Sequence, residues 1–284
     1  MLKTILPPPT YYFLSEMRIK QWTKNLFVYA AILFHGNLFN VEALAVTTLA
    51  FFSFSFTASG IYFFNDIIDI ERDRLNPKKC TRPIAAGRIS KSSGYFCAAL
   101  LMIAGLAIAY GINFSCFMIV LSYVILNLLY SIRLKHVIII DVLIISYGFV
   151  SRTVIGALVT QIHMTIWFIL CVMFLSLLLA LGKRRYDNSM STNPQKVLHV
   201  EFFDQLITIV AAGVVMCYSL FTLDTDTTEM IFTLPLVLYG TFYYLYIVRV
   251  KQNSGAPDEV LYKETPILIT VILYVACVIL IRNV

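Results

Sequence analysis

Long apolar stretches alternate with short polar segments along the whole chain. A helix needs about 20 predominantly apolar residues to cross the hydrocarbon core of a bilayer. By that measure the pattern predicts nine transmembrane helices, at 23–36, 41–65, 93–111, 114–131, 137–159, 164–182, 206–223, 230–249 and 265–282. The first stretch is short, so we expect that helix to tilt or to begin in the membrane interface.

Composition supports the same class of protein. Of the 284 residues, 59% are hydrophobic and only 13% are charged, which is about half the charged share of a soluble domain. A soluble fold of this length cannot bury so much apolar surface, whereas membrane-spanning helices satisfy their own backbone groups in lipid. We expect an all-α membrane protein that forms a single transmembrane domain over residues 1–284 in a lipid bilayer, with no nucleic-acid partner.

Positive charge is distributed unevenly between the predicted helices. All but two of the 22 Lys and Arg residues lie in or beside the N-terminal segment and alternate connections, and the exceptions are Arg152 and Arg282. Cytoplasmic connections of membrane proteins carry such an excess. We therefore expect a multi-pass protein of the cell (inner) membrane, with the N-terminus and the long connections in the cytoplasm and the C-terminus outside.

The strongest chemical signal is an acidic cluster at the end of the second predicted helix. Asp66, Asp69 and Asp73 follow Asn65 at spacings that put the three carboxylates on one face if the helix continues. Mg²⁺ prefers such oxygen ligands and commonly shares its coordination shell with substrate phosphates. We expect Asp66, Asp69 and Asp73 to be catalytic residues that hold Mg²⁺ on a diphosphate, while Asn65 adds a neutral oxygen. The structural alternative is a charged helix end that pairs only with nearby Arg and Lys.

Cationic residues follow in the same connection and in the next one on that side. Lys78 and Arg82 lie close behind the acidic cluster, and Arg can bind phosphate oxygens through two donors at once. Tyr130, Arg133 and Lys135 occupy a tight turn at the expected membrane boundary, where a lipid phosphate would lie. We expect all five residues to bind substrate, although positive charge at the cytoplasmic boundary also occurs without any ligand.

A third polar group ends the sixth predicted helix. It contains Lys183, Arg184 and Asp187, and Lys24 at the start of the first predicted helix has a similar character. We expect these four residues to join the substrate site. Attraction to anionic lipids is the alternative explanation for such cations, but it does not account for segments that mix acids with bases.

These segments resemble the UbiA-type superfamily of intramembrane prenyltransferases. Residues 65–73 match the superfamily's first aspartate-rich motif, N-D-x-x-D-x-x-x-D. The resemblance implies nine transmembrane helices around a central cavity, which cytoplasmic loops cap. It also implies Mg²⁺-dependent group transfer from a diphosphate donor.

The third polar group indicates which branch of the superfamily the chain resembles. Most members of the superfamily carry a second D-x-x-D-type motif after the sixth helix, whereas this chain has one acid there, Asp187, among extra cations. The stretches at 21–25, 82–87, 130–136 and 182–185 are similar to the decaprenyl-phosphate phosphoribosyltransferase branch. That similarity implies phosphoribosyl diphosphate as the donor and a polyprenyl phosphate as the acceptor.

Two other functions remain open at this point. One is transfer of a prenyl group from a prenyl diphosphate to an aromatic acceptor, which uses the same Mg²⁺ chemistry but calls for a second aspartate pair. The other is non-enzymatic transport of a lipid phosphate, which calls for charged or broken helices near the membrane midplane. Only Arg152, inside the fifth predicted helix, partly fits that second requirement.

Overall fold

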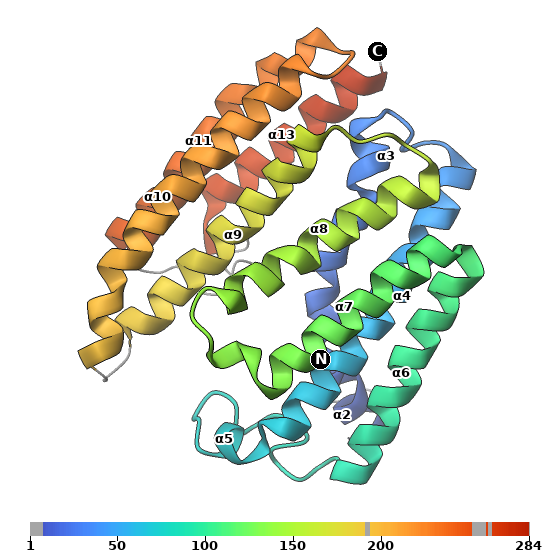
Figure 1. Ribbon diagram of the computed structural model, residues 1–284, viewed down its shortest axis with the longest axis vertical. Helices are drawn as coiled ribbons and strands as arrows, with labels where there is room; N and C mark the ends of the chain where they lie inside the picture. The colour runs from blue at the N-terminus through green and yellow to red at the C-terminus, as the bar shows by residue number, and fades with distance from the viewer. Residues whose placement is uncertain (1–7, 191–193, 252–259, 261–262, 284) are drawn as a thin grey trace. The chain divides into compact units, whose positions relative to one another are not determined.

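The computed structural model describes residues 8–190, 194–251, 260 and 263–283 (Figure 1), and these residues contain helices but no strand. The chain forms two compact units. The first contains the N-terminal residues up to Tyr29 together with Val41–Ile144 and Leu158–Gln161. The second contains Ala30–Asn40, Ile145–Ala157 and Ile162–Val284.

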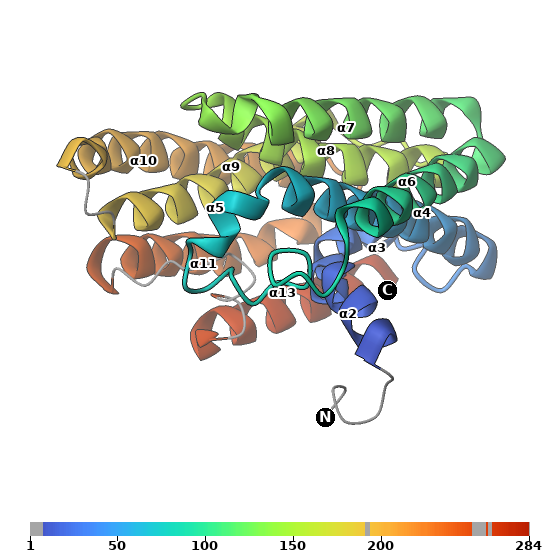
Figure 2. The same cartoon turned by 90° about the horizontal axis from the view of Figure 1, so that it is seen from below.

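The first unit is built on two long helices that lie side by side. Its elements are α2 (Pro8–Glu16), the 3₁₀ helix η1 (Ile19–Tyr29), α4 (Val41–Ile68), α5 (Ile70–Arg74), α6 (Lys91–Ile112), α7 (Phe114–Ile132) and η2 (Leu134–His136), and it contains both ends of α8 (Ile140–Thr160). Helices α4 and α6 form the most extensive contact of this unit, and they run together in both Figure 1 and Figure 2.

Glycines explain how closely α4 and α6 approach. A Cβ atom on Gly60 would lie 2.7 Å from the Ala98 carbonyl oxygen, and one on Gly105 would lie 2.6 Å from the Ser53 carbonyl oxygen. The Ser53 hydroxyl donates a hydrogen bond to the Gly105 carbonyl over 2.7 Å. Small residues that let two backbones meet are the usual basis of helix packing in lipid, where burial of apolar side chains gives no advantage.

Side chains of α4 also hold the N-terminal segment in place. The Trp22 indole Nε1 donates to the Ser59 hydroxyl over 3.1 Å, and the Asn25 amide donates to the Ser55 hydroxyl over 2.9 Å. Runs of 3₁₀ helix longer than three or four residues are uncommon because their hydrogen-bond geometry is poor. These contacts with α4 help to keep the eleven residues of η1 in that conformation.

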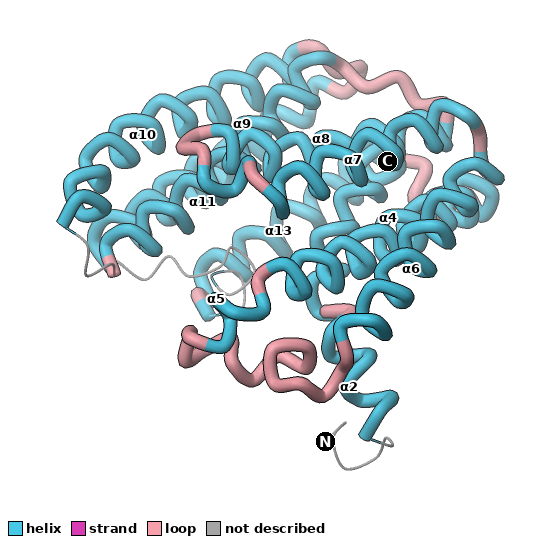
Figure 3. Tube along the Cα trace, turned by 60° about the horizontal axis from the view of Figure 1, so that its bottom comes forward, coloured by secondary structure: helices cyan, strands magenta, loops and turns pink. Residues whose placement is uncertain are grey.

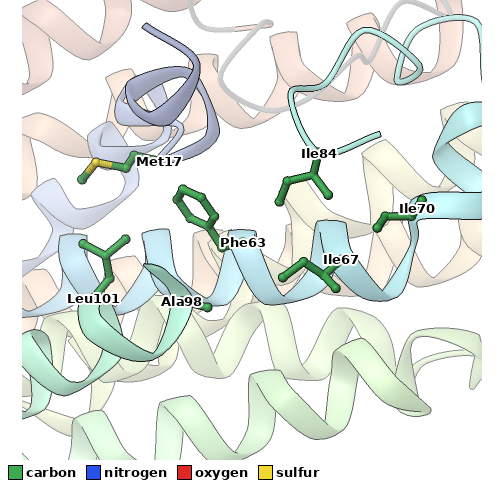
Figure 4. Close-up of a cluster of buried hydrophobic side chains, with 7 residues drawn as sticks. All are labelled: Met17, Phe63, Ile67, Ile70, Ile84, Ala98 and Leu101. Atoms are coloured by element: carbon green, nitrogen blue, oxygen red, sulfur yellow. The ribbon is translucent and has the colours of Figure 1, made fainter. Parts of the chain in front are cut away.

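A buried apolar cluster forms around the end of α4. It consists of Met17, Phe63, Ile67, Ile70, Ile84, Ala98 and Leu101 (Figure 4). Ile84 comes from the loop that joins α5 to α6, drawn in pink in Figure 3, and its side chain faces the end of α4. The cluster therefore fixes that loop and the residue after α2 against the segment that carries the aspartates.

The second unit contains three long helices and several shorter elements. They are α3 (Ala30–Phe34), the remainder of α8, α9 (Ile166–Ser189), α10 (Pro194–Leu223), η3 (Thr228–Thr233), α11 (Leu234–Tyr246), the π-helical turn η4 (Ile247–Lys251) and α13 (Thr265–Asn283). Helices α9 and α10 form its largest contact, while α11 packs on α13.

One buried arginine joins three elements of the second unit. Arg185 of α9 is 7% exposed and binds both carboxylate oxygens of Asp204 in α10, at 2.8 and 3.3 Å. The third guanidinium nitrogen of Arg185, Nη1, donates to the Val248 carbonyl in η4 over 2.9 Å. A π-helical turn frees carbonyl groups from the regular ladder, and here one of them has a guanidinium partner.

The predicted spans agree with the structure in all but the first case. Eight helices within the described ranges have the length and composition to cross a membrane, and each overlaps one predicted span. The chain is therefore a multi-pass, all-α membrane protein. The predicted span at 23–36 is not confirmed, since η1 covers Ile19–Tyr29 and α3 only Ala30–Phe34. Its apolar residues gave the hydropathy signal, but hydrogen bonds to α4 hold much of it in 3₁₀ form.

The contact between α4 and α6 predicts that Gly105→Ala destabilises the protein. The added methyl group would meet Thr57 Oγ1 at 2.1 Å as well as the Ser53 carbonyl, and overpacking of this kind costs about 1–3 kcal/mol. Gly111→Ala in the same helix is the matched control, because nothing lies within 4 Å of its Cβ position. Thermal unfolding in detergent should show a lower Tm for Gly105→Ala only. Equal Tm values for the two variants would contradict this account.

Candidate functional site

The aspartates lie where α4 gives way to α5. Helix α4 ends at Ile68 and α5 begins at Ile70, yet Asp69 N donates to Asn65 O and Asp73 N donates to Asp69 O, at 3.0 and 2.8 Å. The helical hydrogen-bond ladder thus continues across the junction, close to what the spacing of the acids required. Asp66 and Asp73 are both 1% exposed, so their charges need partners inside the protein.

One arginine bridges the two buried carboxylates. Arg82 Nη1 lies 3.0 Å from Asp66 Oδ1 and 2.6 Å from Asp73 Oδ2. Arg82 comes from the α5–α6 loop, whose turn is closed by the hydrogen bond from Ala86 N to the Arg82 carbonyl. The sequence predicted Arg82 at the site, and the structure places it there with its cation between two acids.

Arg18 provides the second partner of Asp66. Its guanidinium forms a short ion pair with Asp66 Oδ2 and lies over the Tyr62 ring, 4.8 Å from the centroid. Arg18 has a positive φ of 52°, a conformation that costs a non-glycine residue energy and is found at functional sites. Sequence reasoning missed this residue because it lies 48 positions before Asp66, and only its position beside the Gln21–Asn25 stretch hinted at a role.

Two lysines also pair with the aspartates. Lys135 Nζ lies 2.5 Å from Asp69 Oδ1, and Lys79 Nζ lies 3.8 Å from Asp73 Oδ1. Partial burial and the neighbouring Arg82 lower the pKa of Lys79, and Asp73 opposes this effect. The sequence predicted Lys135 and Lys78 as substrate-binding residues and did not name Lys79. Lys78 is exposed, its backbone N–H donates to Asn76 Oδ1 over 3.0 Å, and its substrate-binding role remains a prediction.

A further acid lies beside this cluster. Glu16, the last residue of α2, is 2% exposed, and neither of its carboxyl oxygens has a hydrogen-bond partner among the described residues. Burial, followed by the proximity of Asp66, raises the pKa of Glu16 to about 8. Sequence reasoning gave no signal for it, because nothing in its spacing relates it to the aspartates.

The donor atoms suit Mg²⁺ without yet forming a closed metal site. Across residues 8–190, 194–251, 260 and 263–283, no three acidic, His or Cys side chains converge closely enough to hold a metal ion. Arg82 Nη1 nevertheless shows that oxygens of Asp66 and Asp73 can face one cation from both sides. Carboxylate oxygens in such a pair are the ligands Mg²⁺ prefers. Asp69 faces Lys135 instead, so it would have to turn from that lysine to join them.

The other predicted substrate residues of the first unit differ in exposure. Asn65, Lys24 and Tyr130 are half-buried, and Arg133 is exposed. The ion pairs of the aspartates described above involve Arg18, Lys79, Arg82 and Lys135. Their substrate-binding roles remain predictions.

The predicted cationic group of the second unit is on the last turns of α9. Lys183 and Asp187 are exposed and Arg184 is half-buried, so their charged groups are accessible. The buried bond from Arg185 to Asp204 holds this end of α9. Sequence reasoning did not single out Arg185 from its neighbours, and the structure assigns it to packing within the second unit.

Comparison with known proteins identifies the family. The UbiA prenyltransferase family model matches residues 25–272. The chain therefore belongs to the UbiA prenyltransferase family, and it is a membrane transferase.

The two curated relatives described next carry the same enzyme name. The decaprenyl-phosphate phosphoribosyltransferase of Mycolicibacterium smegmatis is 30% identical over 273 residues, which cover 88% of this chain and 86% of that protein. The enzyme of the same name from Corynebacterium glutamicum is 30% identical over 286 residues, covering 94% of this chain and 85% of the relative.

Solved structures share the fold. A UbiA homolog from Archaeoglobus fulgidus bound to GPP and Mg²⁺ superposes with a TM-score of 0.77 at 20% identity, covering 96% of this chain and 100% of the other. A digeranylgeranylglyceryl phosphate synthase matches with a TM-score of 0.69 at 19% identity, covering 97% and 99%. At these identities the likeness establishes the UbiA fold and nothing finer.

The position of Arg82 between Asp66 and Asp73 predicts that its removal lowers the stability of the protein and that Mg²⁺ restores it. Arg82→Gln leaves the carboxylates of Asp66 and Asp73 buried without the cation that bridges them. Breaking a buried ion pair costs about 3–5 kcal/mol, and we expect a smaller loss here because Arg82 is 25% exposed. Thermal unfolding in EDTA should give a lower Tm for this variant, and millimolar Mg²⁺ should restore most of the loss. Arg72→Gln, an exposed site on α5, should change little in either buffer. A loss that Mg²⁺ does not reverse would show that the two carboxylates cannot share a metal ion.

Proposed function

We propose that this UbiA-family protein transfers the 5-phosphoribosyl group of phosphoribosyl diphosphate to a polyprenyl phosphate, with Mg²⁺ and with release of diphosphate. The observation that carries the proposal is the charge around the aspartates. Three carboxylates are met by four cations, Arg18, Lys79, Arg82 and Lys135. A prenyl diphosphate offers two phosphoryl groups to such a site, whereas phosphoribosyl diphosphate offers three and the acceptor adds a fourth.

The ion pairs also explain how the site would receive its donor. Asp66 and Asp73 would hold Mg²⁺, and the side chains of Arg82 and Lys79 would then be released as donors for diphosphate oxygens. Arg18 and Lys135 would be released in the same way from Asp66 and Asp69. Each buried charge exchanges one partner for another and none is left unpaired, which avoids the large cost of a bare buried ion.

The residues of this chain would then act by position and charge. Bound Mg²⁺ would stabilise negative charge on the departing diphosphate. The bond from the ribosyl anomeric carbon to diphosphate breaks, the electron pair leaves with diphosphate, and an oxygen of the lipid phosphate forms the new bond to that carbon. The lipid phosphate is already ionised, so no general base is needed, and orientation with electrostatic stabilisation supplies the catalysis.

Lys183 and Arg184 support the choice of donor from the second unit. They occupy the segment where the resemblance to the UbiA superfamily led us to expect a second acidic motif, and that segment has the single acid Asp187. Cations there suit substrates that both carry phosphate. The relatives named decaprenyl-phosphate phosphoribosyltransferase point to the same donor and to a polyprenyl acceptor.

The distribution of charge favours one orientation of the protein. The aspartates, Arg82 and Lys183 all lie in segments rich in Lys and Arg, which are typical of the cytoplasmic side. We place the active-site loops and the N-terminus in the cytoplasm and the C-terminus outside the cell membrane. A water-soluble donor such as phosphoribosyl diphosphate would be available on that side.

Prenyl transfer is the second candidate, because two structural neighbours were solved with prenyl diphosphates, GPP and DMAPP, and Mg²⁺. It uses the same aspartates but leaves the excess cations without substrate partners. An acceptor assay with a prenyl diphosphate and aromatic quinone precursors tests it directly.

Purified protein should convert labelled phosphoribosyl diphosphate and a polyprenyl phosphate into a labelled lipid, and EDTA should abolish the product. Asp69→Asn should reduce the rate by about 10²-fold or more, in the range found when one strongly stabilising group is removed from an active site. Glu71→Gln, whose side chain is 80% exposed two residues away, is the control and should retain full activity. The absence of labelled lipid with acceptors of several chain lengths would refute the proposal.

The exchange of partners also predicts that metal and diphosphate bind cooperatively. Isothermal titration calorimetry with inorganic diphosphate should show tighter binding in Mg²⁺ than in EDTA by about 5- to 150-fold, the usual range of coupling between two ligands. In Arg82→Gln the coupling should shrink, because the residue that changes partners is missing. Identical affinity with and without Mg²⁺ would contradict the exchange.

A further inference from the structure

Glu16 is a buried carboxyl group for which the proposed reaction has so far given no role. It ends α2, and the two residues that follow it are held by separate contacts. Met17 belongs to the apolar cluster, and its carbonyl accepts a hydrogen bond from the Ser59 hydroxyl over 2.8 Å. Arg18 pairs with Asp66. The backbone on which Glu16 sits is thus fixed beside the aspartates by independent contacts.

Both oxygens of Glu16 are buried without a hydrogen-bond partner among the described residues. Leaving a buried polar group unsatisfied costs about 1–3 kcal/mol, and more if the group is charged. Proteins tolerate few such groups, and each one calls for an explanation such as a missing ligand. Asp66, 1% exposed, lies beside Glu16, so a ligand reaching Asp66 also reaches Glu16.

The chemistry of the donor narrows what this ligand group can be. A diphosphate oxygen only accepts hydrogen bonds, so it repels an ionised Glu16 and leaves the carbonyl oxygen of a protonated Glu16 without a donor. No third acidic, His or Cys side chain among the described residues joins Glu16 and Asp66 to complete a metal site. A hydroxyl group fits, because it donates to a carboxyl oxygen. The hydrocarbon chain of a prenyl diphosphate has no hydroxyl, whereas ribose has two.

We propose that Glu16 binds the ribose hydroxyl groups of the donor and so selects a phosphoribosyl diphosphate over a prenyl diphosphate. This inference rests on the proposed function and adds a specificity-determining residue to it. A site built to bond a hydroxyl rejects an analogue that lacks it, because its own buried group is then left unpaired. Glu16 would therefore act against the prenyl donor as well as in favour of the ribosyl donor.

Binding measurements with three ligands, each in Mg²⁺, separate this role from others. The ligands are inorganic diphosphate, phosphoribosyl diphosphate and geranyl diphosphate, titrated by calorimetry into the full-length protein in detergent. Glu16→Ala should weaken the binding of phosphoribosyl diphosphate by about 10- to 100-fold, as for a buried hydrogen-bonding group that loses its partner, and leave the binding of inorganic diphosphate unchanged. Glu16→Gln, which keeps hydrogen-bonding atoms, should lose less. Glu71→Ala is the exposed control and should bind all three ligands as the unmodified protein does.

Deoxyribose analogues of the donor provide a second test, and its first part uses only the unmodified protein. The unmodified protein should bind the 2-deoxy or the 3-deoxy analogue about 10-fold or more weaker than the parent donor. In Glu16→Ala the same deoxy change should cost little more, because the two losses remove one interaction and so do not add. Since the substitution removes an unsatisfied group, the Tm of ligand-free Glu16→Ala should not fall.

Each remaining outcome overturns the inference in a distinguishable way. Equal weakening of inorganic diphosphate and phosphoribosyl diphosphate in Glu16→Ala would assign Glu16 to the metal or to Arg18 instead of to ribose. Full affinity of Glu16→Ala and of the deoxy analogues would show that ribose is held elsewhere, and the proposed function would stand. Failure of the unmodified protein to bind phosphoribosyl diphosphate would remove the proposed function and this inference together.

Discussion

The bridge from Arg82 to Asp66 and Asp73 is the contact on which the first unit's site depends. Two carboxylates at 1% exposure are costly to bury as charges, and the cation between them offsets that cost. Arg82 can supply that cation only if its loop is pinned, and Ile84, two residues further on, pins it by packing against Ile67 and Ile70. The packing of the apolar cluster and the ion pairs of Arg82 are therefore two parts of one arrangement.

Sequence reasoning reached the features that depend on local spacing. The period of the helix relates Asp66, Asp69 and Asp73 to one another, and length with hydropathy located eight helices that the structure confirms as long enough to cross a membrane. It was less successful where a tertiary contact overrides the local pattern. The stretch at 23–36 has the apolar content of a span, but Trp22 and Asn25 bond to serines of α4 and much of the segment is 3₁₀.

The missed site residues share a physical cause. Arg18, Lys79 and Glu16 reach the aspartates through the fold, and no periodicity in the sequence connects them. Choosing Lys79 over Lys78 needs the direction in which each side chain leaves the loop, and charge alone does not give it. Glu16 could not be found from the sequence at all, because an acid at the end of a short helix is ordinarily exposed, and only its 2% exposure marks it.

An excess of cations around an aspartate motif changes which phosphorylated substrates the site can bind. A site with acids alone needs all its metal ions to hold a diphosphate, since nothing else in it is positive. Here Arg18, Lys79, Arg82 and Lys135 neutralise the acids of the first unit before any ligand arrives. If Mg²⁺ displaces these cations, each becomes available to phosphate, and affinity should grow with the number of phosphoryl groups on the substrates. A second acidic motif is then unnecessary, and a donor and an acceptor that are both phosphorylated are favoured.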